Sequence, residues 1–143
     1  MEDLLAGVQL NDNQRRHFEV LLTRLEDSLS TIERLLAAPP LRHLTQLSDD
    51  VSPDFRTLAE AEIPRLRGQV ERMAVALGLR PNVVSLRRII GAALTTDSVR
   101  LQDSLSPQMR GYGAVDASVA ERLDPALLRL AESLQHLGSA LKR

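Results

Sequence analysis

Three histidines, His17, His43 and His136, are the side chains of this chain best suited to metal or proton chemistry. A metal site in a helical bundle typically combines histidine and glutamate three residues apart on one helix face. None of the three histidines has a glutamate three positions before it, and the chain contains no cysteine that could supply a thiolate ligand. The sequence therefore predicts ordinary surface or boundary histidines, with no metal and no other cofactor.

Phosphoryl transfer is a second chemistry that histidine performs in helical bundles, so His17 and His43 have to be compared with phosphorelay proteins. The motifs of that class place lysine or an acidic residue close after the histidine, followed by small residues, and neither "RRHFEVL" nor "LRHLTQL" has this pattern. A Ser/His/Asp set and a glycine-rich phosphate loop have no candidate either. We therefore predict that the protein is not an enzyme, with histidine phosphotransfer as the alternative.

A cluster of arginines, Arg80, Arg87 and Arg88, surrounds the start of a predicted helix. Cations are unfavourable at the positive end of a helix unless an anionic group offsets them. One interpretation is a site for a phosphate group or an acidic partner. The other is pairing with acidic side chains of the preceding helix, namely Glu60, Glu62 or Glu71.

The elements that position these residues are predicted to be helices. The chain has 143 residues, of which 43% are hydrophobic but only 2% aromatic, so its core must be built from small and medium aliphatic side chains. No segment alternates apolar and polar residues between turn signals at the spacing of strands. The composition therefore indicates an all-α fold of one domain.

The charge balance argues against two classes of partner. Eighteen basic and nineteen acidic residues give a formal net charge of −1, so no overall field attracts nucleic acid or an anionic membrane. No run of apolar residues is long enough for a membrane-spanning helix. The first ten residues, "MEDLLAGVQL", carry acidic residues where a secretory signal needs basic ones. We therefore expect a cytoplasmic protein with no nucleic-acid or membrane partner.

Apolar residues that alternate at spacings of four and three predict four long helices. We expect an N-terminal arm over 1–10 and an antiparallel four-helix bundle over 11–143, with kinks near Pro64 and Pro125. A connector containing Leu41, Leu44 and Leu47 is predicted to form a short helical turn over the bundle. The three regular stripes are Phe18, Leu22, Leu25, Leu29, Ile32 and Leu36; Ala59, Ile63, Leu66, Val70, Met73 and Leu77; and Ala120, Leu123, Leu127, Leu130, Leu134, Leu137 and Leu141.

The third stripe is irregular. Val83, Leu86, Ile90 and Ala93 start a pattern that would next place Asp97 in the core, whereas a pattern restarted at Leu94 continues with Ser98, Leu101 and Leu105. This shift predicts a bend or break near "TTDS".

A repeated heptapeptide suggests how the bundle is organised. "RLEDSLS" at 24–30 returns as "RLQDSLS" at 100–106, and the preceding residues also agree when four residues are skipped. The offset is close to half the chain, which predicts two helical hairpins that arose by tandem duplication. The alternative is that amphipathic helices resemble one another by composition alone.

Apolar residues beside the seam of the first helix give the functional prediction. Leu21 and Leu35 lie two heptads apart with Ser28 between them, so they form a ridge that a second copy of the chain could contact. We predict a protein-protein interaction or scaffold module that forms a homo-oligomer or binds another protein. Alternatives are a bundle that binds a small apolar ligand, and a monomer in which the connector Leu41 to Leu47 covers Leu35.

Overall fold

The computed structural model describes residues 2–143; helix makes up 72% of the chain, and this part contains no β-strand. The all-α prediction is confirmed. The long helices are α2 (Asp12–Ala37), α3 (Pro53–Ala76), α4 (Leu86–Gln102) and α6 (Asp124–Leu141). Shorter elements are α1 (Glu2–Leu5), α5 (Ser106–Met109), a 3₁₀ turn (Arg110–Tyr112) and a π-helical turn (Val119–Leu123). No helix of the described residues is long and apolar enough to cross a bilayer.

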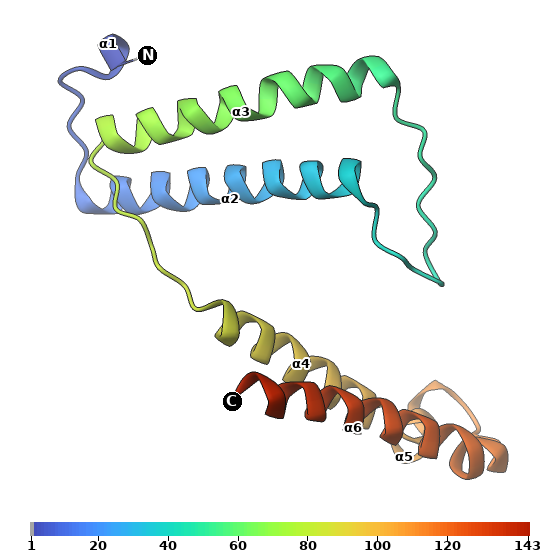
Figure 1. Cartoon of the computed structure of the whole chain (residues 1–143). Helices are drawn as coiled ribbons and strands as arrows, with labels where there is room; N and C mark the ends of the chain where they lie inside the picture. Colours follow the sequence, from blue (N-terminus) through green and yellow to red (C-terminus); the bar gives the residue numbers. More distant parts are fainter. Residues whose placement is uncertain (1) are drawn as a thin grey trace. The chain divides into compact units, whose positions relative to one another are not determined.

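The chain divides into two compact units, Met1–Asn82 and Val83–Arg143. Each unit contains one antiparallel pair of long helices, α2 with α3 in the first hairpin and α4 with α6 in the second (Figure 1). The four-helix bundle is not confirmed, because α1 and α5 add further helices and the long helices are divided between two compact units. The extent of a single domain over 11–143 stays a prediction.

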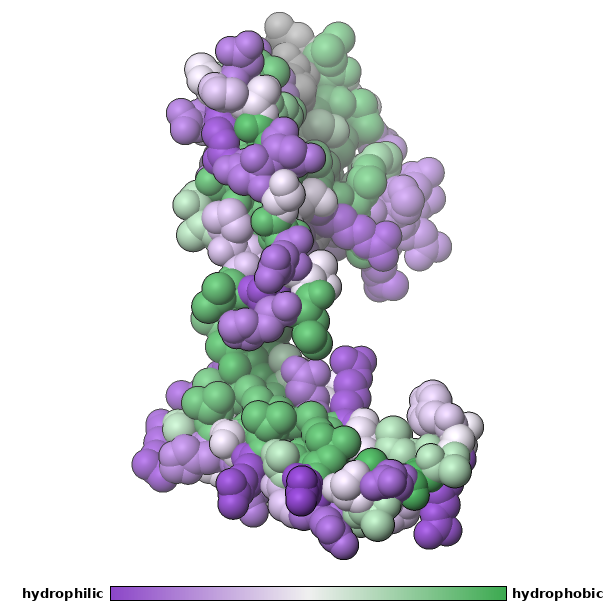
Figure 2. Space-filling model, turned by 90° about the vertical axis from the view of Figure 1, so that its right-hand side faces the viewer, coloured by the Kyte–Doolittle hydropathy of each residue, from purple (hydrophilic) through white to green (hydrophobic). Residues whose placement is uncertain are grey.

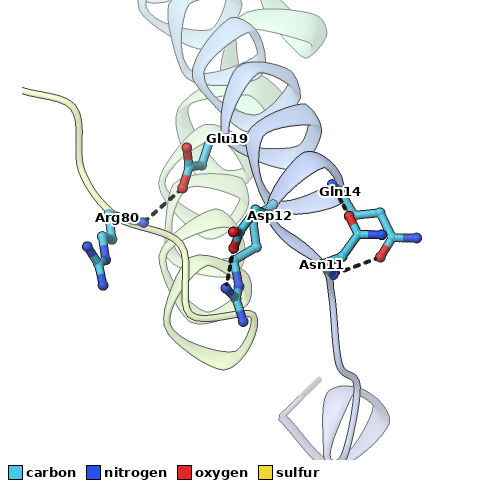
Figure 3. Close-up of polar contacts among 6 residues, drawn as sticks. Asn11, Asp12, Gln14, Glu19 and Arg80 are labelled. Carbon is cyan, nitrogen blue, oxygen red and sulfur yellow. Dashed lines mark hydrogen bonds and ion pairs between the residues drawn. The ribbon is translucent and has the colours of Figure 1, made fainter.

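The start of α2 lies where the sequence places it. Asn11 Oδ1 accepts a hydrogen bond of 2.8 Å from the backbone N–H of Gln14, and Gln14 Oε1 accepts one of 3.0 Å from the backbone N–H of Asn11 (Figure 3). This reciprocal pair satisfies two backbone donors that a helix start leaves free. The helix ends at Ala37, just before Pro39 and Pro40, which cannot continue it.

Both ends of α3 also follow their local signals. Ser52 Oγ accepts a hydrogen bond of 3.2 Å from the backbone N–H of Phe55, and Pro53 occupies the first helical position. At the other end Gly78 has a φ of 66°, in the left-handed region. The N–H groups of Gly78 and Leu79 donate to the carbonyls of Val75 and Ala74, which completes a Schellman motif.

The two prolines inside predicted helices, Pro64 and Pro125, affect the backbone in different ways. Pro64 lies inside α3, which is continuous from Pro53 to Ala76, and a kink at this proline stays a prediction. Before Pro125 the chain forms the π-helical turn, in which the N–H of Asp124 donates to the carbonyl of Val119, five residues earlier. Because proline lacks an N–H, the wider turn rearranges the hydrogen bonds ahead of it. Two abutting helical segments therefore meet at Pro125.

The structure of α4 shows which of the two patterns in the irregular third stripe faces the partner helix. The helix begins at Leu86, after the N-cap Ser85, and the residues turned toward its partner helix are Gly91, Leu94, Ser98 and Leu101. The pattern that restarts at Leu94 is therefore the correct one. The predicted break near "TTDS" is wrong, because α4 runs through these residues without interruption.

The two hairpins are held by narrow seams. In the first hairpin the buried apolar residues are Leu22, Leu29, Ala59, Ile63, Val70 and Leu77. In the second the most buried residues are small: Ser98 is 6% exposed and Ala131 2%. A Cβ added to Gly91 would lie 3.6 Å from Leu141 Cδ2, so this glycine also helps α4 and α6 to approach. Each seam is narrower than the stripe of apolar residues on its helices.

The connector between α2 and α3 differs from its prediction. Residues 39–52 contain no helical turn, and Leu41 and Leu44 are 91% and 101% exposed. The three-residue spacing of leucines resembled a helix face, but the prolines at 39 and 40 and the absence of neighbouring residues to pack against leave the segment extended. Arg56 of α3 anchors it through Asp49, and its Nη1 also donates 2.9 Å to the carbonyl of Leu36 in the last turn of α2.

The repeated heptapeptide adopts two structures. "RLEDSLS" at 24–30 lies entirely within α2, whereas "RLQDSLS" at 100–106 spans the end of α4, a turn and the first residue of α5. In the second copy the backbone N–H of Ser106 donates 2.9 Å to Asp124 Oδ1 and its hydroxyl donates 2.6 Å to Asp124 Oδ2. The chain is organised as two hairpins, but their origin by duplication stays a prediction.

The seam of the first hairpin predicts where stability is concentrated. We expect Leu29→Ala to lower the free energy of unfolding by about 2–5 kcal/mol, because it leaves a cavity at a position that is 4% exposed. Leu130→Ala should cost much less, although its stripe suggested a core position, because Leu130 is 56% exposed. Urea denaturation of both variants tests this, and equal losses would show that Leu130 is covered in solution.

Pro64 predicts a stabilising substitution. Pro64→Ala should raise the free energy of unfolding by about 2 kcal/mol. Alanine restores a backbone hydrogen bond inside α3, and this gain is partly offset because the unfolded chain gains conformational entropy when proline is removed. Pro53→Ala is the matched control, since proline is well tolerated at the first helical position. Thermal melts of the two variants measure the difference, and a destabilised Pro64→Ala protein would contradict the argument.

Candidate functional site

An exposed apolar ridge runs along α2 beside the seam. Leu21 and Leu35, the predicted self-association residues, are 48% and 38% exposed, and Leu25 and Ile32 are exposed to a similar extent. Leu25 and Ile32 come three residues after the seam residues Leu22 and Leu29, so they lie just to one side of the seam. The structure therefore brings Leu21 and Leu35 into one ridge with two residues that the sequence placed in the core.

Helix α3 contributes a second ridge that the sequence did not single out. Phe55, Leu58 and Leu66 are 36–57% exposed. Leu66 comes three residues after the seam residue Ile63, the same offset as on α2. Because α2 and α3 are antiparallel, an equal offset turns both ridges toward the same side of the hairpin. We call this side the open face; it consists of Leu21, Leu25, Ile32 and Leu35 on α2 and Phe55, Leu58 and Leu66 on α3.

The other side of the first hairpin carries charged residues, and one of its arginines bridges the two helices. The guanidinium of Arg67 forms an ion pair with Glu33 and donates 3.0 Å to Ser30 Oγ. A groove of about 290 Å³ lies on this side, lined by Leu36, Ala59, Ile63 and Pro64 together with Glu33, Ala37, Arg56 and Glu60. Small-molecule sites begin at about this volume and have a mostly apolar lining, as this groove has, so the binding of a small apolar ligand stays an alternative. This side of the first hairpin thus combines charged residues with a small groove, whereas the open face is apolar.

Arg56 ties the connector to the start of α3. Its Nη2 donates to both carboxylate oxygens of Asp49, each at 2.6 Å. These hydrogen bonds, with the charge of Arg56, hold the pKa of Asp49 below its ordinary value of 3.8. The pair lies at the surface, so its role is to position the connector and not to supply much stability.

The second hairpin also leaves large apolar side chains outside its seam. On α6 Leu130 and Leu137 are half-exposed, and on α4 Leu86 and Ile90 are exposed. Figure 2 shows hydrophobic side chains gathered in one area of the visible face of this hairpin, the lower part of the view. Asp97 follows Leu86 and Ile90 on the same ridge of α4, and Arg100 pairs with it at 3.6 Å. This face therefore has a charge within its apolar area.

The three arginines of the predicted anion patch belong to different units. Arg80 follows α3, and its backbone N–H donates 3.3 Å to Glu19 Oε1 while its guanidinium points away from Glu19 (Figure 3). Arg87 and Arg88 lie in the first turn of α4 in the second unit. Among the described residues none of the ion pairs includes these arginines, so the alternative of pairing with Glu60, Glu62 or Glu71 is not observed. A shared anion site stays a prediction.

The histidines lie apart from one another along the chain. His17 is on α2, where its ring meets the edge of Phe18 at a centroid distance of 5.4 Å. His43 is in the extended connector and His136 is on α6, and all three are exposed. Within residues 2–143 no group of three or more His, Asp or Glu side chains is arranged to hold a metal ion.

The Asp49–Arg56 contact generates a prediction on pH. Because the folded pKa of Asp49 is lowered, the stabilisation from its carboxylate is present above the unfolded pKa and is lost as the pH falls through the folded pKa. In Arg56→Gln the pKa should rise toward 3.8. An NMR titration of the Asp49 carboxyl carbon in both proteins measures this; an unchanged value would assign the shift to another donor.

Comparisons with known proteins do not indicate a function for this chain. No protein-family model, no curated protein and no solved structure matches this chain. The features that the structure offers for function are therefore the open face of the first hairpin, the apolar face of the second hairpin and the arginines at positions 80, 87 and 88.

Proposed function

We propose that this chain is a non-enzymatic helical interaction module that self-associates through the open face of the first hairpin. Two copies would place their open faces together and form a four-helix bundle from two hairpins. The observation that carries the proposal is that seven large apolar side chains on one side of α2 and α3 remain 36–57% exposed. Contiguous exposed apolar surface of this kind is typical of protein-protein contacts.

The size of the open face suits a contact between proteins. On α2 it runs from Leu21 to Leu35, which corresponds to a length of about 21 Å, and two adjacent helices are about 20 Å wide. The face therefore covers roughly 400 Å², a size at which exposed apolar patches commonly mark contacts between proteins. This is about half of the area that each partner contributes to a standard interface, so we expect a dimer that dissociates on dilution. Association would also remove its leucines from water, which is the main driving force for such contacts.

The competing account, in which the connector covers Leu35, has less support. Leu41 and Leu44 extend into solvent and bury almost no surface on the hairpin. Leu35 keeps an exposure similar to that of Leu25 and Ile32, which are far from the connector in the sequence. The apolar ridge of α2 is thus open along its whole length.

Two charges placed on the open face test the proposal. We expect the wild-type chain to sediment as a dimer and the Leu21→Glu/Leu35→Glu variant as a monomer, because a dimer would bury four carboxylates without partners. Analytical ultracentrifugation over a range of protein concentrations measures the equilibrium. Both positions are exposed and glutamate favours helix, so the helical circular dichroism spectrum should be retained.

The matched control is Leu41→Glu/Leu44→Glu, which makes the same chemical change on the connector. It should leave the dimer intact, because neither leucine belongs to the open face. A monomeric wild-type chain would refute self-association. A dimer that survives the Leu21→Glu/Leu35→Glu change would place the interface on another surface.

A further inference from the structure

From the pattern of the open face we infer its partner and its register: a second copy of the chain, related by a two-fold axis that passes beside Ser28, with Leu21 against Leu35 of the partner subunit. In this arrangement α2 packs antiparallel on α2 of the second copy. The inference rests on the proposed self-association and adds the geometry of the contact.

The ridge of α2 is nearly palindromic. From Leu21 it continues through Leu25, Ser28 and Ile32 to Leu35, and the residue types read almost identically in reverse. Leu21 and Leu35 are each seven residues from Ser28, while Leu25 and Ile32 are three and four residues from it. A two-fold contact requires a surface that is complementary to itself under reversal. The ridge has this property about Ser28.

The side chains of the ridge also favour close approach at its centre. Ser28 is small and exposed, so it allows two helix axes to come within about 8 Å, the lower limit for helix packing. No charged residue interrupts the ridge from Leu21 to Leu35. On the second hairpin, by contrast, Asp97 lies on the apolar ridge of α4 and is paired with Arg100, so a two-fold contact there would have to remove this ion pair from water.

Helix α3 extends the same symmetry. The hydrogen bond from Arg67 Nη2 to Ser30 Oγ places the middle of α3 beside the middle of α2. Leu66, the residue before Arg67, therefore lies on the open face at about the level of Ser28. An axis beside Ser28 then brings Leu66 near the partner subunit's Leu66, so that the apolar layer continues across both helices.

A second dimer geometry uses the same face. If the axis ran parallel to the helices, α2 would pack on α3 of the second copy, and the two copies of Ser28 would lie on different sides of the interface. The two geometries therefore differ in the distance between the two copies of residue 28, which makes this residue a reporter.

The absence of cysteine from the chain makes the test specific. Ser28→Cys introduces one thiol, and a disulfide forms only where two Cα atoms come within about 7 Å. Thr23→Cys is the matched control, because Thr23 is an exposed position of α2 on the polar side of the hairpin. The purified variants are oxidised under mild conditions and analysed by non-reducing electrophoresis, and wild-type protein is sedimented in parallel.

We expect about tenfold more covalent dimer for Ser28→Cys than for Thr23→Cys. A mixture of Leu21→Cys with size-tagged Leu35→Cys should give mainly the mixed dimer. If the wild-type chain is a dimer but Ser28→Cys does not cross-link above the control, the two-fold register is wrong while the proposed self-association stands. A wild-type chain that is monomeric in ultracentrifugation overturns both.

Discussion

The rest of this structure depends on one constraint: two helices can cover only a narrow strip of each other. A helix whose apolar residues alternate at spacings of four and three presents a stripe wider than one neighbouring helix can bury. In the first hairpin Leu22 and Leu29 face α3, while Leu25 and Ile32 of the same stripe stay half-exposed. The hairpin is therefore apolar on one side, and this side is its candidate for function.

The two hairpins meet this constraint in different ways. The first is joined by aliphatic residues such as Leu29 and Ile63 and is secured on its polar side by Arg67, which contacts Glu33 and Ser30. The second is joined through small residues, with Ser98 and Ala131 at its centre and a hydrogen bond of 3.4 Å from Gln135 Nε2 to Ser98 Oγ. Close packing through small side chains leaves Leu130 and Leu137 of α6 outside the seam. Both hairpins thus expose apolar residues. In the first, the exposed ridge of α2 contains no charged residue, whereas in the second the ridge of α4 contains Asp97.

The repeated heptapeptide shows how context changes the structure of one sequence. In the first copy Ser30 is followed by residues that continue α2, and its hydroxyl accepts a hydrogen bond from Arg67. In the second copy Pro107 has no N–H to donate to the carbonyl of Asp103, so α4 cannot continue through it and ends at Gln102. The contacts of Ser106 with Asp124 then fix the turn that leads away from α4. A local pattern of core leucines predicts a helix, and a single proline with one tertiary partner ends it.

The sequence by itself determined the helices and most of their ends, because these depend on interactions within a few residues: the capping by Asn11 and Ser52, the left-handed Gly78 and the breaks at proline. It also identified Leu21 and Leu35 as apolar residues outside the seam. Only the tertiary structure decided which part of each stripe is buried, and therefore that Leu25 joins them and that α3 supplies Phe55, Leu58 and Leu66. The physical reason is that periodicity gives the direction of a side chain on its own helix, whereas burial depends on how many neighbouring helices are present to cover it.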